Sequence, residues 1–487
     1  MAVAPVQQSP WKGHIFNGSW AAARGGTLEV TEPATGTVLT QVGRGSPADV
    51  QEAARSAAVA QVAWAATPVR ERAEVLLRTA AFLAQNAEEI AAFIGRETGG
   101  TVLKGTHEVR EAEAQLKQAA GMILQSDGVV LPSTPGRLSV ARRVPLGVVG
   151  VISPFNFPLI LSMRSVAPAL AVGNGVVLKP DAQTPVSGGF FLAMAFEAGG
   201  LPEGLLHVLP GDAEVGEALC TDPNVQMISF TGSTATGRRV GELAGKHLKK
   251  VALELGGKNS LIILEDADLD LAAKNVAWGA YLHQGQICMA TGRVLVHEKI
   301  APALTAKMVE KATHLPVGDP AKGNVALGPL INERQRNRVH EIVQQAVGEG
   351  AKLEAGGNYD GLFYEPTVLS GVRPSMRAFR EEVFGPVANI TSFSSDDEAV
   401  ALANDTEYGL SAAVISNSVG RAMAIANRLK VGLVHVNDQT VNDEVVNPFG
   451  GCGVSGNHTS MGGPADIGEY TQWRWMTVKD APPPYPF

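Results

Sequence analysis

Short apolar runs alternate with longer amphipathic segments along most of this chain. Runs rich in β-branched residues predict strands at residues 147–152, 176–178, 225–230, 260–264 and 293–297. Between them, Ala-rich segments with apolar residues at helical spacing predict helices, such as 47–67, 73–98 and 184–197. A second set of strands and helices follows over residues 271–436. Strands that alternate with helices form parallel sheets with helical crossovers, so we predict an α/β fold.

Two segments break this alternation and predict a small additional β element. Residues 128–144 are typical of a hairpin around a turn at 132–136. Residues 470–478 are strand-like and lead into a Pro-rich tail at 482–487. An exposed hairpin and a terminal strand leave unpaired edges, which are natural places for subunits to join. We therefore expect this element to support self-association.

The composition is typical of a globular protein, and the net charge indicates no polyanionic partner. The chain has 487 residues, of which 45% are hydrophobic and 18% charged. This length is enough for roughly two to four domains with substantial cores. The formal net charge of -8 gives no general attraction to nucleic acid or anionic lipid, so we expect neither as a partner. The most apolar region, residues 146–177, is interrupted by prolines, asparagines and Arg164, which argues against a membrane span.

The cysteines and the first residues bear on the compartment. Only three cysteines occur, Cys220, Cys288 and Cys452, so we expect no disulfide scaffold. Residues 1–11 lack a basic segment followed by an apolar stretch, so we expect no secretory signal. The expected location is the reducing cytoplasm, and we expect no metal site.

The candidate nucleophile is Cys288, in the segment HQGQICMA of residues 283–290. A thiolate adds readily to an aldehyde carbonyl and gives a thiohemiacetal. Taken alone, a cysteine between Ile287 and Met289 is more often a small buried core residue. The Gly-Gln-Ile-Cys setting favours the catalytic interpretation without deciding it.

Two further polar residues complete a candidate catalytic set. Glu254 follows an apolar run and precedes two glycines, and a carboxylate among apolar neighbours has the raised pKa that suits a general base. Asn156 lies between prolines in PFNFP and can direct its amide at a developing oxyanion. Each has an ordinary alternative, namely a turn or helix-end glutamate and an Asx turn.

A dinucleotide site is indicated by a strand that runs into TGSTATG at residues 231–237. A Gly-rich turn that opens a helix directs backbone N–H groups at a pyrophosphate, although this spacing is not the usual GxGxxG. Lys179, at the carboxyl end of another strand, can reach ribose hydroxyls, or it is an ordinary exposed lysine. Glu382 and Phe384 can hold the nicotinamide ribose and ring, or they form a charged turn with a core phenylalanine.

Taken together, the motifs of this chain resemble the aldehyde dehydrogenase superfamily in their order and approximate spacing. These motifs are PFNFP, LKP, FTGSTATG, LELGGK, GQIC, EEVFGP and NPFGGCGVSG. The chain is similar in particular to the bacterial benzaldehyde and vanillin dehydrogenase branch. The segments that carry this finer similarity are WKGHIFNGSW, KPDAQTPVSGG, AWGAYLHQGQICMA, HVNDQTVNDE and the final YPF.

The resemblance implies a division of the chain into three functional parts. Residues 1–127 and 145–255 would form a Rossmann-like dinucleotide-binding domain, and residues 256–450 a second α/β domain that carries the nucleophile. Residues 128–144 and 466–487 would form the β element through which the family builds homodimers or homotetramers.

The resemblance also implies roles for individual residues. Cys288 matches the nucleophile, Glu254 the general base and Asn156 the oxyanion ligand. The expected contacts to NAD or NADP are Lys179, Asp181, Gly232, Ser233, Glu382 and Phe384. Because a glutamate is present at position 254, water should hydrolyse the thioester, and the product should be a free carboxylic acid rather than a coenzyme A ester.

Three positions depart from the pattern. Many NAD-specific members carry a glutamate where this chain has Ala182, and that carboxylate would repel a 2′-phosphate. With only Asp181 beside it, we expect the enzyme to accept both NAD and NADP. The lysine and glutamate that relay protons from the general base in many members are replaced by Ser165 and Gln472. We therefore expect Glu254 to exchange its proton through water or another group.

The expected substrate tunnel is apolar. By motif position it should be bordered by Phe157, Ile160, Leu282, Ile287 and Phe449, although some of these are as readily plain core residues. An aryl ring gains from such a slot, so we expect an aromatic aldehyde such as benzaldehyde or vanillin. Aliphatic aldehydes and semialdehydes are the alternative. A cysteine esterase without redox chemistry, or a non-catalytic binding protein, are alternatives of other classes.

Overall fold

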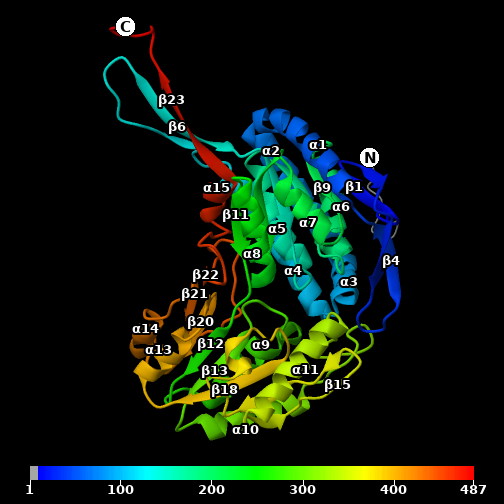
Figure 1. Ribbon diagram of the computed structural model, residues 1–487, viewed down its shortest axis with the longest axis vertical. Helices are drawn as coiled ribbons and strands as arrows, with labels where there is room; N and C mark the ends of the chain where they lie inside the picture. The colour runs from blue at the N-terminus through cyan, green and yellow to red at the C-terminus, as the bar shows by residue number, and fades with distance from the viewer. Residues whose placement is uncertain (1–8) are drawn as a thin grey trace.

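Two seven-stranded sheets organise the computed structural model, which describes residues 9–487 (Figure 1). The first sheet lies in the upper lobe of Figure 1 and has the strand order β11-β10-β7-β8-β9-β1-β2. The strands are β11 (Lys250–Glu254), β10 (Val225–Thr231), β7 (Val148–Ile152), β8 (Gly175–Lys179), β9 (Leu206–Val208), β1 (His14–Asn17) and β2 (Trp20–Ala22). The run from β11 to β9 is parallel, and the N-terminal strands β1 and β2 extend it antiparallel at one edge.

Helices cover both faces of the first sheet, which explains why its strands are continuously apolar. Successive residues of β7 point to opposite faces, so that Val149 and Val151 pack in one core cluster while Val148 and Ile152 pack in the other. One face carries α1 (Pro47–Ala66), α7 (Ala213–Thr221) and α8 (Thr234–Lys246). The other carries α2 (Val69–Gln85), α3 (Ala87–Thr98), α4 (Val102–Met122), α5 (Pro158–Ala171) and α6 (Phe191–Gly199).

Two of the expected helices are not continuous. The segment 73–98 is divided at Asn86, whose side-chain amide donates to the carbonyl oxygen of Phe82 (2.8 Å) and so ends α2. The segment 184–197 begins as a short π-helix, η2 (Val186–Phe190), before α6. The buried carboxylate of Glu97 accepts hydrogen bonds from the backbone N–H groups of Val186 and Ser187, which fixes this irregular start.

The second sheet lies in the lower lobe and has the order β14-β17-β18-β13-β12-β20-β21. Its strands are β14 (Lys352–Ala355), β17 (Thr367–Ser370), β18 (Val387–Phe393), β13 (Thr291–His297), β12 (Asn259–Ile263), β20 (Ser411–Ile415) and β21 (Leu433–Val436). Only β14 pairs antiparallel. Its faces are covered by α9 (Leu269–Tyr281) with α10 (Ala301–His314), and by α11 (Glu333–Gly348), α12 (Arg377–Arg380), α13 (Asp396–Asn404) and α14 (Val419–Ala426). The α/β fold predicted from the sequence, with parallel strands in both lobes, is therefore confirmed.

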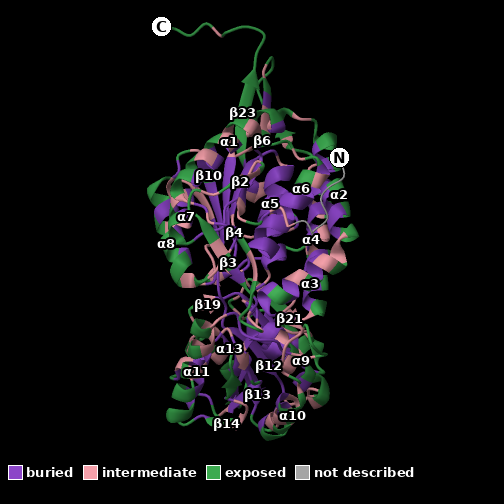
Figure 2. Ribbon diagram, turned by 90° about the vertical axis from the view of Figure 1, so that its right-hand side faces the viewer, coloured by how far each residue is buried: buried purple, intermediate pink, exposed green. Residues whose placement is uncertain are grey.

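A third sheet projects from the upper lobe (Figures 1 and 2). It contains β5 (Gly128–Val130), β6 (Leu138–Pro145) and the C-terminal β23 (Thr471–Val478), which pairs antiparallel with β6 along its whole length. The remaining elements are the small pairs β3 (Thr27–Thr31) with β4 (Val38–Gly43), β15 (Tyr359–Asp360) with β16 (Phe363–Tyr364), and β19 (Tyr408–Gly409) with β22 (Cys452–Gly453), together with η3 (Leu282–Gly285) and α15 (Ala465–Tyr470). Over residues 9–487, no helix combines the length and the apolar character needed to cross a membrane.

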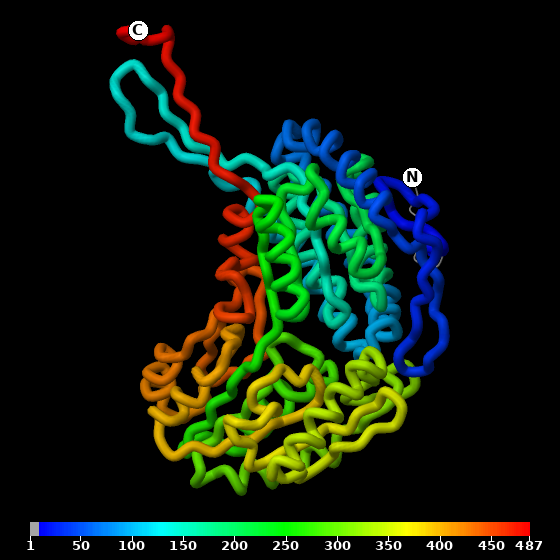
Figure 3. Tube along the Cα trace, viewed as in Figure 1, coloured from blue at the N-terminus to red at the C-terminus, as the bar shows by residue number. Residues whose placement is uncertain are grey.

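The chain passes between the lobes directly after β11 (Figure 3). Residues 255–258 link the last strand of the first sheet to β12 of the second sheet. Glu254 ends β11, and Cys288 lies just before β13, the neighbour of β12. The two residues are therefore brought toward each other by the connection between the two sheets.

Candidate active site

The carboxyl ends of four parallel strands meet at one edge of the first sheet. In register, Thr231 of β10 lies opposite Glu254 of β11, and Ile152 of β7 lies opposite Lys179 of β8. Asn156 follows β7 after a short loop. Ligands of open α/β sheets bind at the carboxyl ends of the strands, so this edge is where the expected catalytic and cofactor residues should gather.

The loop that carries Cys288 is held by the segment that follows Glu254. The side-chain amide of Asn259 donates to the carbonyl oxygens of Cys288 and Ala290, both at 2.8 Å. A side chain at Gly257 would place its Cβ 2.5 Å from the carbonyl oxygen of Cys288, so this close approach requires glycine. The motif LELGGKN thus provides both the candidate base and the support for the candidate nucleophile.

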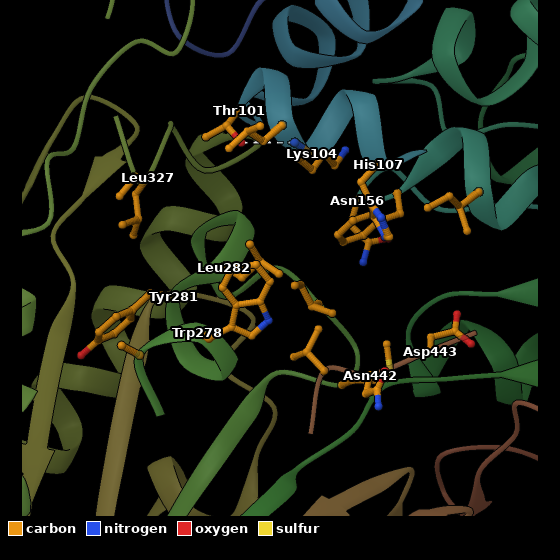
Figure 4. A pocket seen from close by; sticks show the side chains of 18 of the residues that line it. Thr101, Lys104, His107, Asn156, Trp278, Tyr281, Leu282, Leu327, Asn442 and Asp443 are labelled. Carbon is orange, nitrogen blue, oxygen red and sulfur yellow. Dashed lines mark hydrogen bonds between the residues drawn. The ribbon is translucent and has the colours of Figure 1, made fainter. Parts of the chain in front are cut away.

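A cavity of about 1300 Å³ opens beside Cys288 and is walled by both lobes. Figure 4 shows Lys104, His107 and Asn156 facing Trp278 and Leu282 across the space, with Asn442 and Asp443 on the lower right. The five residues expected to border the substrate tunnel all lie in its wall: Phe157, Ile160, Leu282, Ile287 and Phe449. Cys288 packs among apolar side chains here, because Ile287, Met289, Leu410 and Phe449 form one core cluster around it.

Burial controls the ionisation of both candidate catalytic groups. Burial raises the pKa of the Cys288 thiol to about 12; the Glu382 carboxylate adds to this, and the charge of Arg164 opposes it. Burial likewise raises the pKa of Glu254 well above its usual value, again opposed by Arg164. Both carboxylate oxygens of Glu254 are buried, and neither has a hydrogen-bond partner within residues 9–487. A carboxylate in such surroundings is a strong base once it is ionised.

Asn156 is buried, and its position is set by the start of α5. Its Nδ2 donates one hydrogen bond to the carbonyl oxygen of Gln286 (2.9 Å), next to the nucleophile loop. An amide nitrogen has two donors, so the second is available to an oxyanion. The Glu108 carboxylate accepts from the backbone N–H groups of Leu159 (3.0 Å) and Ile160 (3.4 Å), which fixes the first turn of α5 directly after Asn156.

Two of the expected dinucleotide residues, Gly232 and Ser233, lie at the start of α8. Ser233 caps this helix, and its hydroxyl accepts from the backbone N–H of Thr236 (3.3 Å). A Cβ at Gly232 would lie 2.6 Å from the ring of Phe230, so the close packing of this turn on that ring favours glycine. The free N–H groups of a helix start fit a pyrophosphate.

Lys179 and Asp181 lie at the end of β8. The Nζ of Lys179 has a backbone carbonyl, that of Pro180 (3.2 Å), as its hydrogen-bond partner. Burial lowers the pKa of Lys179, an effect that Asp181 and Asp212 oppose. The Asp181 carboxylate accepts from the backbone (2.9 Å) and side chain (3.3 Å) of Gln183 and is thus partly committed to its own turn.

Glu382 and Phe384 belong to the second lobe and contact residues at its boundary with the first lobe. Glu382 accepts from the backbone N–H of Gly257 (3.0 Å), and burial raises its pKa to about 7. Phe384 has a positive φ of 56° and meets Phe155 edge to face, with ring centroids 5.9 Å apart. Glu382 thus contacts the segment that links the two lobes, and the Phe384 ring contacts the loop after β7, so residues of the second lobe reach the first lobe here.

Comparison with known proteins agrees with this arrangement. The sequence model of the "Aldehyde dehydrogenase family" matches residues 20–476. The chain belongs to the aldehyde dehydrogenase family. It is 52% identical over 483 residues to a vanillin dehydrogenase from an Amycolatopsis species, with 99% of each chain covered. It is 48% identical over 482 residues to "Benzaldehyde dehydrogenase [NAD(+)]" from Pseudomonas putida, again covering 99% of each. A solved betaine aldehyde dehydrogenase from Staphylococcus aureus, in complex with NAD+, superposes with a TM-score of 0.95 at 30% identity, covering 100% of this chain and 97% of that one.

These findings confirm the family resemblance predicted from the motifs. This aldehyde dehydrogenase departs from the family pattern at Ser165 and Gln472, and the structure shows the surroundings of both. Ser165 is buried and shares a hydrogen bond with the hydroxyl of Ser229 (2.9 Å), with the sulfur of Met461 alongside (3.7 Å). Gln472 lies exposed on β23, opposite Val144 of β6. Neither position supplies an ionisable group to Glu254.

Arg164 both faces the cavity and forms an ion pair. Its Nη2 contacts the Oδ2 of Asp443, and its guanidinium lies 4.6 Å from the ring centroid of Phe449. Sequence reasoning identified Arg164 but not Asp443, which is 279 residues away. It also missed Trp278 and Tyr281 in the cavity wall. Both lie on the last turn of α9, four and one residues before Leu282, and this spacing could have indicated them. Within residues 9–487, no group of three or more His, Cys, Asp or Glu side chains is placed to hold a metal ion.

Proposed function

We propose that this enzyme oxidises aromatic aldehydes to carboxylic acids with Cys288 as the nucleophile. The observation that carries this proposal is the grouping of a thiol, an amide donor and a carboxylate around Cys288. The Cys288 thiol and the free amide donor of Asn156 line one cavity, and Glu254, whose buried carboxylate has no hydrogen-bond partner within residues 9–487, lies close enough for its charge to act on that thiol. Thiol, oxyanion donor and base are the parts needed for nucleophilic attack on a carbonyl and later hydrolysis.

In the proposed mechanism Glu254 first removes the proton from the Cys288 thiol, directly or through one water. The thiolate attacks the aldehyde carbon, and the oxygen becomes an oxyanion that accepts hydrogen bonds from Asn156 Nδ2 and the backbone N–H of Cys288. A bound nicotinamide dinucleotide supplies the acceptor for the hydride that leaves this carbon. Cys288 then holds a thioester. Glu254 passes the thiol proton to solvent water and then takes a proton from a second water. The resulting hydroxide attacks the thioester carbon, the C–S bond breaks, and the carboxylic acid leaves as the thiolate is restored.

The cofactor is proposed to be NAD, held by Lys179, Asp181, Gly232, Ser233, Glu382 and Phe384. Support comes from the start of α8 at Ser233, the partly buried amine of Lys179, and the Glu382 carboxylate, which accepts from the segment that links the lobes. The Pseudomonas putida relative is named for NAD(+), and the superposed Staphylococcus aureus structure contains it. Use of NADP as well remains a prediction from Ala182.

The functional division is proposed to follow the sheets. Residues up to 127 and 145–255 bind the dinucleotide, and residues 256–450 carry the nucleophile. The projecting sheet, from 128–144 and 466–487, is proposed to join subunits into a homodimer or homotetramer. Trp473 and Trp475 on β23 are 53% and 65% exposed, which favours cover by another subunit. We expect the enzyme in the cytoplasm, where a free catalytic thiol stays reduced.

Aromatic aldehydes are proposed as substrates because the cavity wall near Cys288 is rich in rings and branched apolar side chains, including Phe157 and Phe449. Aryl rings gain from stacking and burial in such a slot. The two relatives named above are a vanillin and a benzaldehyde dehydrogenase.

The test is to measure reduced dinucleotide by absorbance across a panel of aryl and alkyl aldehydes. We expect the highest kcat/KM with benzaldehyde-type substrates and none above background for Cys288→Ala. A higher kcat/KM for aliphatic aldehydes or semialdehydes would contradict the substrate proposal. Full activity of Cys288→Ala would contradict the mechanism.

A further inference from the structure

A partly buried ion pair interrupts the otherwise largely apolar wall near Cys288. The side chains of Arg164 and Asp443 are only 8% and 23% exposed, yet both line the large cavity. Arg164 comes from α5 of the first lobe, whereas Asp443 comes from the loop after β21. An ion pair withdrawn from water loses much of its Coulombic gain to desolvation. A pair that only held two segments together would therefore add little to the stability of the fold.

Arg164 and Asp443 have donor and acceptor groups that form no hydrogen bond with other described residues. A guanidinium has five donors and a carboxylate accepts several hydrogen bonds. Within residues 9–487, the one hydrogen bond formed by the side chains of Arg164 and Asp443 is the contact that joins them. None of the other polar atoms of these two side chains is fully buried without a hydrogen-bond partner. These atoms are therefore accessible from the cavity. An unused donor and an unused acceptor therefore stand side by side at the cavity.

This donor and acceptor are close to where the substrate reacts. The charges of Arg164 and Asp443 both act on the thiol of Cys288 and on the carboxylate of Glu254. Glu382 also acts on the thiol, and Glu469 also acts on the carboxylate. Arg164 is also fixed in orientation, because its guanidinium packs against the Phe449 ring. A ring attached to Cys288 through its aldehyde carbon would lie in the same chamber.

We propose that the Arg164–Asp443 pair is a specificity site for a hydroxyl group on the aromatic ring of the substrate. The hydroxyl donates its hydrogen to Asp443 and accepts a hydrogen bond from Arg164. A methoxy group can only accept, and an unsubstituted ring does neither. A charged ring substituent is disfavoured in either sign, because one member of the pair repels it. This inference rests on the proposed oxidation of aromatic aldehydes.

The test compares kcat/KM for benzaldehyde, its three monohydroxy isomers and its three monomethoxy isomers. We expect at least one hydroxy isomer to exceed both benzaldehyde and its methoxy counterpart by roughly tenfold or more, the range of a hydrogen bond to a charged group. In Arg164→Met/Asp443→Leu both charges leave together, and this preference should fall to roughly threefold or less. Intrinsic reactivity is the same in every variant, so the change in the ratio reports the contact.

A matched control removes a guanidinium elsewhere on the cavity. Arg110 also lines the cavity, is 73% exposed and pairs with Glu111 at 3.5 Å. Arg110→Gln should leave the hydroxyl preference unchanged. Asp443→Asn keeps the shape while removing the carboxylate charge, and it should reduce the hydroxyl preference more than the activity on benzaldehyde. If the double variant does not fold, dissociation constants measured in Cys288→Ala, with and without Asp443→Asn, provide the same ratio.

The possible failures are distinguishable. If the native enzyme oxidises no aromatic aldehyde, the proposed function fails. If it oxidises benzaldehyde but favours no hydroxy isomer, or if the preference survives removal of the pair, only the inference about Arg164 and Asp443 is overturned. Equal losses for all substrates in Asp443→Asn would likewise overturn it, because the pair would then be purely structural.

Discussion

Replacing Glu108 with alanine should destabilise the enzyme far more than an ordinary loss of a salt bridge. Glu108 is fully buried, accepts from two backbone N–H groups at the start of α5, and pairs with the buried Lys104. The substitution removes all three interactions and leaves the ammonium of Lys104 buried without its acid. Breaking a buried pair in this way costs about 3–5 kcal/mol.

The chain offers a matched control on the same helix. Glu113 and Lys117 form an exposed pair four residues apart on α4, with an Nζ–Oε1 distance of 2.5 Å. Exposed pairs contribute about 0–1 kcal/mol. For a cooperative unit of domain size, 1 kcal/mol shifts Tm by about 2–4 °C, so Glu108→Ala should lower Tm by roughly 6–20 °C and Glu113→Ala by at most roughly 4 °C.

The assay is thermal unfolding of both variants at one scan rate, because a large enzyme unfolds irreversibly and its Tm depends on the rate. Activity below the transition adds a second readout. Because α5 begins directly after Asn156, loosening its first turn should lower kcat even in protein that is still folded, and Glu108→Gln should lie between the wild type and the alanine variant. Equal Tm shifts for Glu108→Ala and Glu113→Ala would refute the proposed role of Glu108 in holding the first turn of α5.

Further predictions concern the base, the oxyanion donor and the cofactor. Glu254→Gln should turn over roughly 10²–10⁴-fold more slowly, because deprotonation of Cys288 and hydrolysis of the thioester both lose their base; an unchanged steady rate would exclude Glu254 as the base. Because burial raises the pKa of Glu254, its ionised fraction grows as pH rises, so the wild-type steady rate should increase above neutral pH. Asn156→Ala should lower kcat by roughly 10²–10³-fold with intact folding by circular dichroism. The wild type should use both dinucleotides, and Ala182→Glu should increase its preference for NAD; a native preference for NAD above roughly a thousandfold (~4 kcal/mol) would contradict this.

Much of the fold could be predicted from the sequence because burial on both faces leaves a direct signal. Strands such as β7 and β12 are covered by helices on either side and therefore appear as continuous apolar runs. The short strands β1, β2 and β14, which lie at or next to a sheet edge, escaped prediction because they are partly exposed and have weak patterns. The break at Asn86 was also missed, because the apolar spacing continues through it and a single side-chain hydrogen bond ends α2.

The site could be predicted only where its parts lie in local motifs. Glu254 and Gly257 are neighbours in the sequence, and their glycine-rich setting indicates close packing against another segment. The contact between Arg164 and Asp443 has no such local sign, because it joins a helix to an irregular loop that only the folded lobes bring together. Asp443 by itself is one acidic residue in a polar stretch, and its meaning depends on a partner that sequence spacing does not indicate.

The environment of Ser165 argues against a lost relay that could simply be restored. Its hydroxyl is buried against Ser229 and Met461, so a lysine there would place an ammonium among groups that cannot neutralise it. Gln472 is exposed on β23, and Glu254 is influenced instead by Arg164, Asp443 and Glu469. We therefore expect Ser165→Lys/Gln472→Glu to lower Tm without raising kcat, measured by thermal unfolding and steady-state kinetics. A sharp rise in kcat at an unchanged pH optimum would show that the existing proton route is poor, and would refute exchange through water.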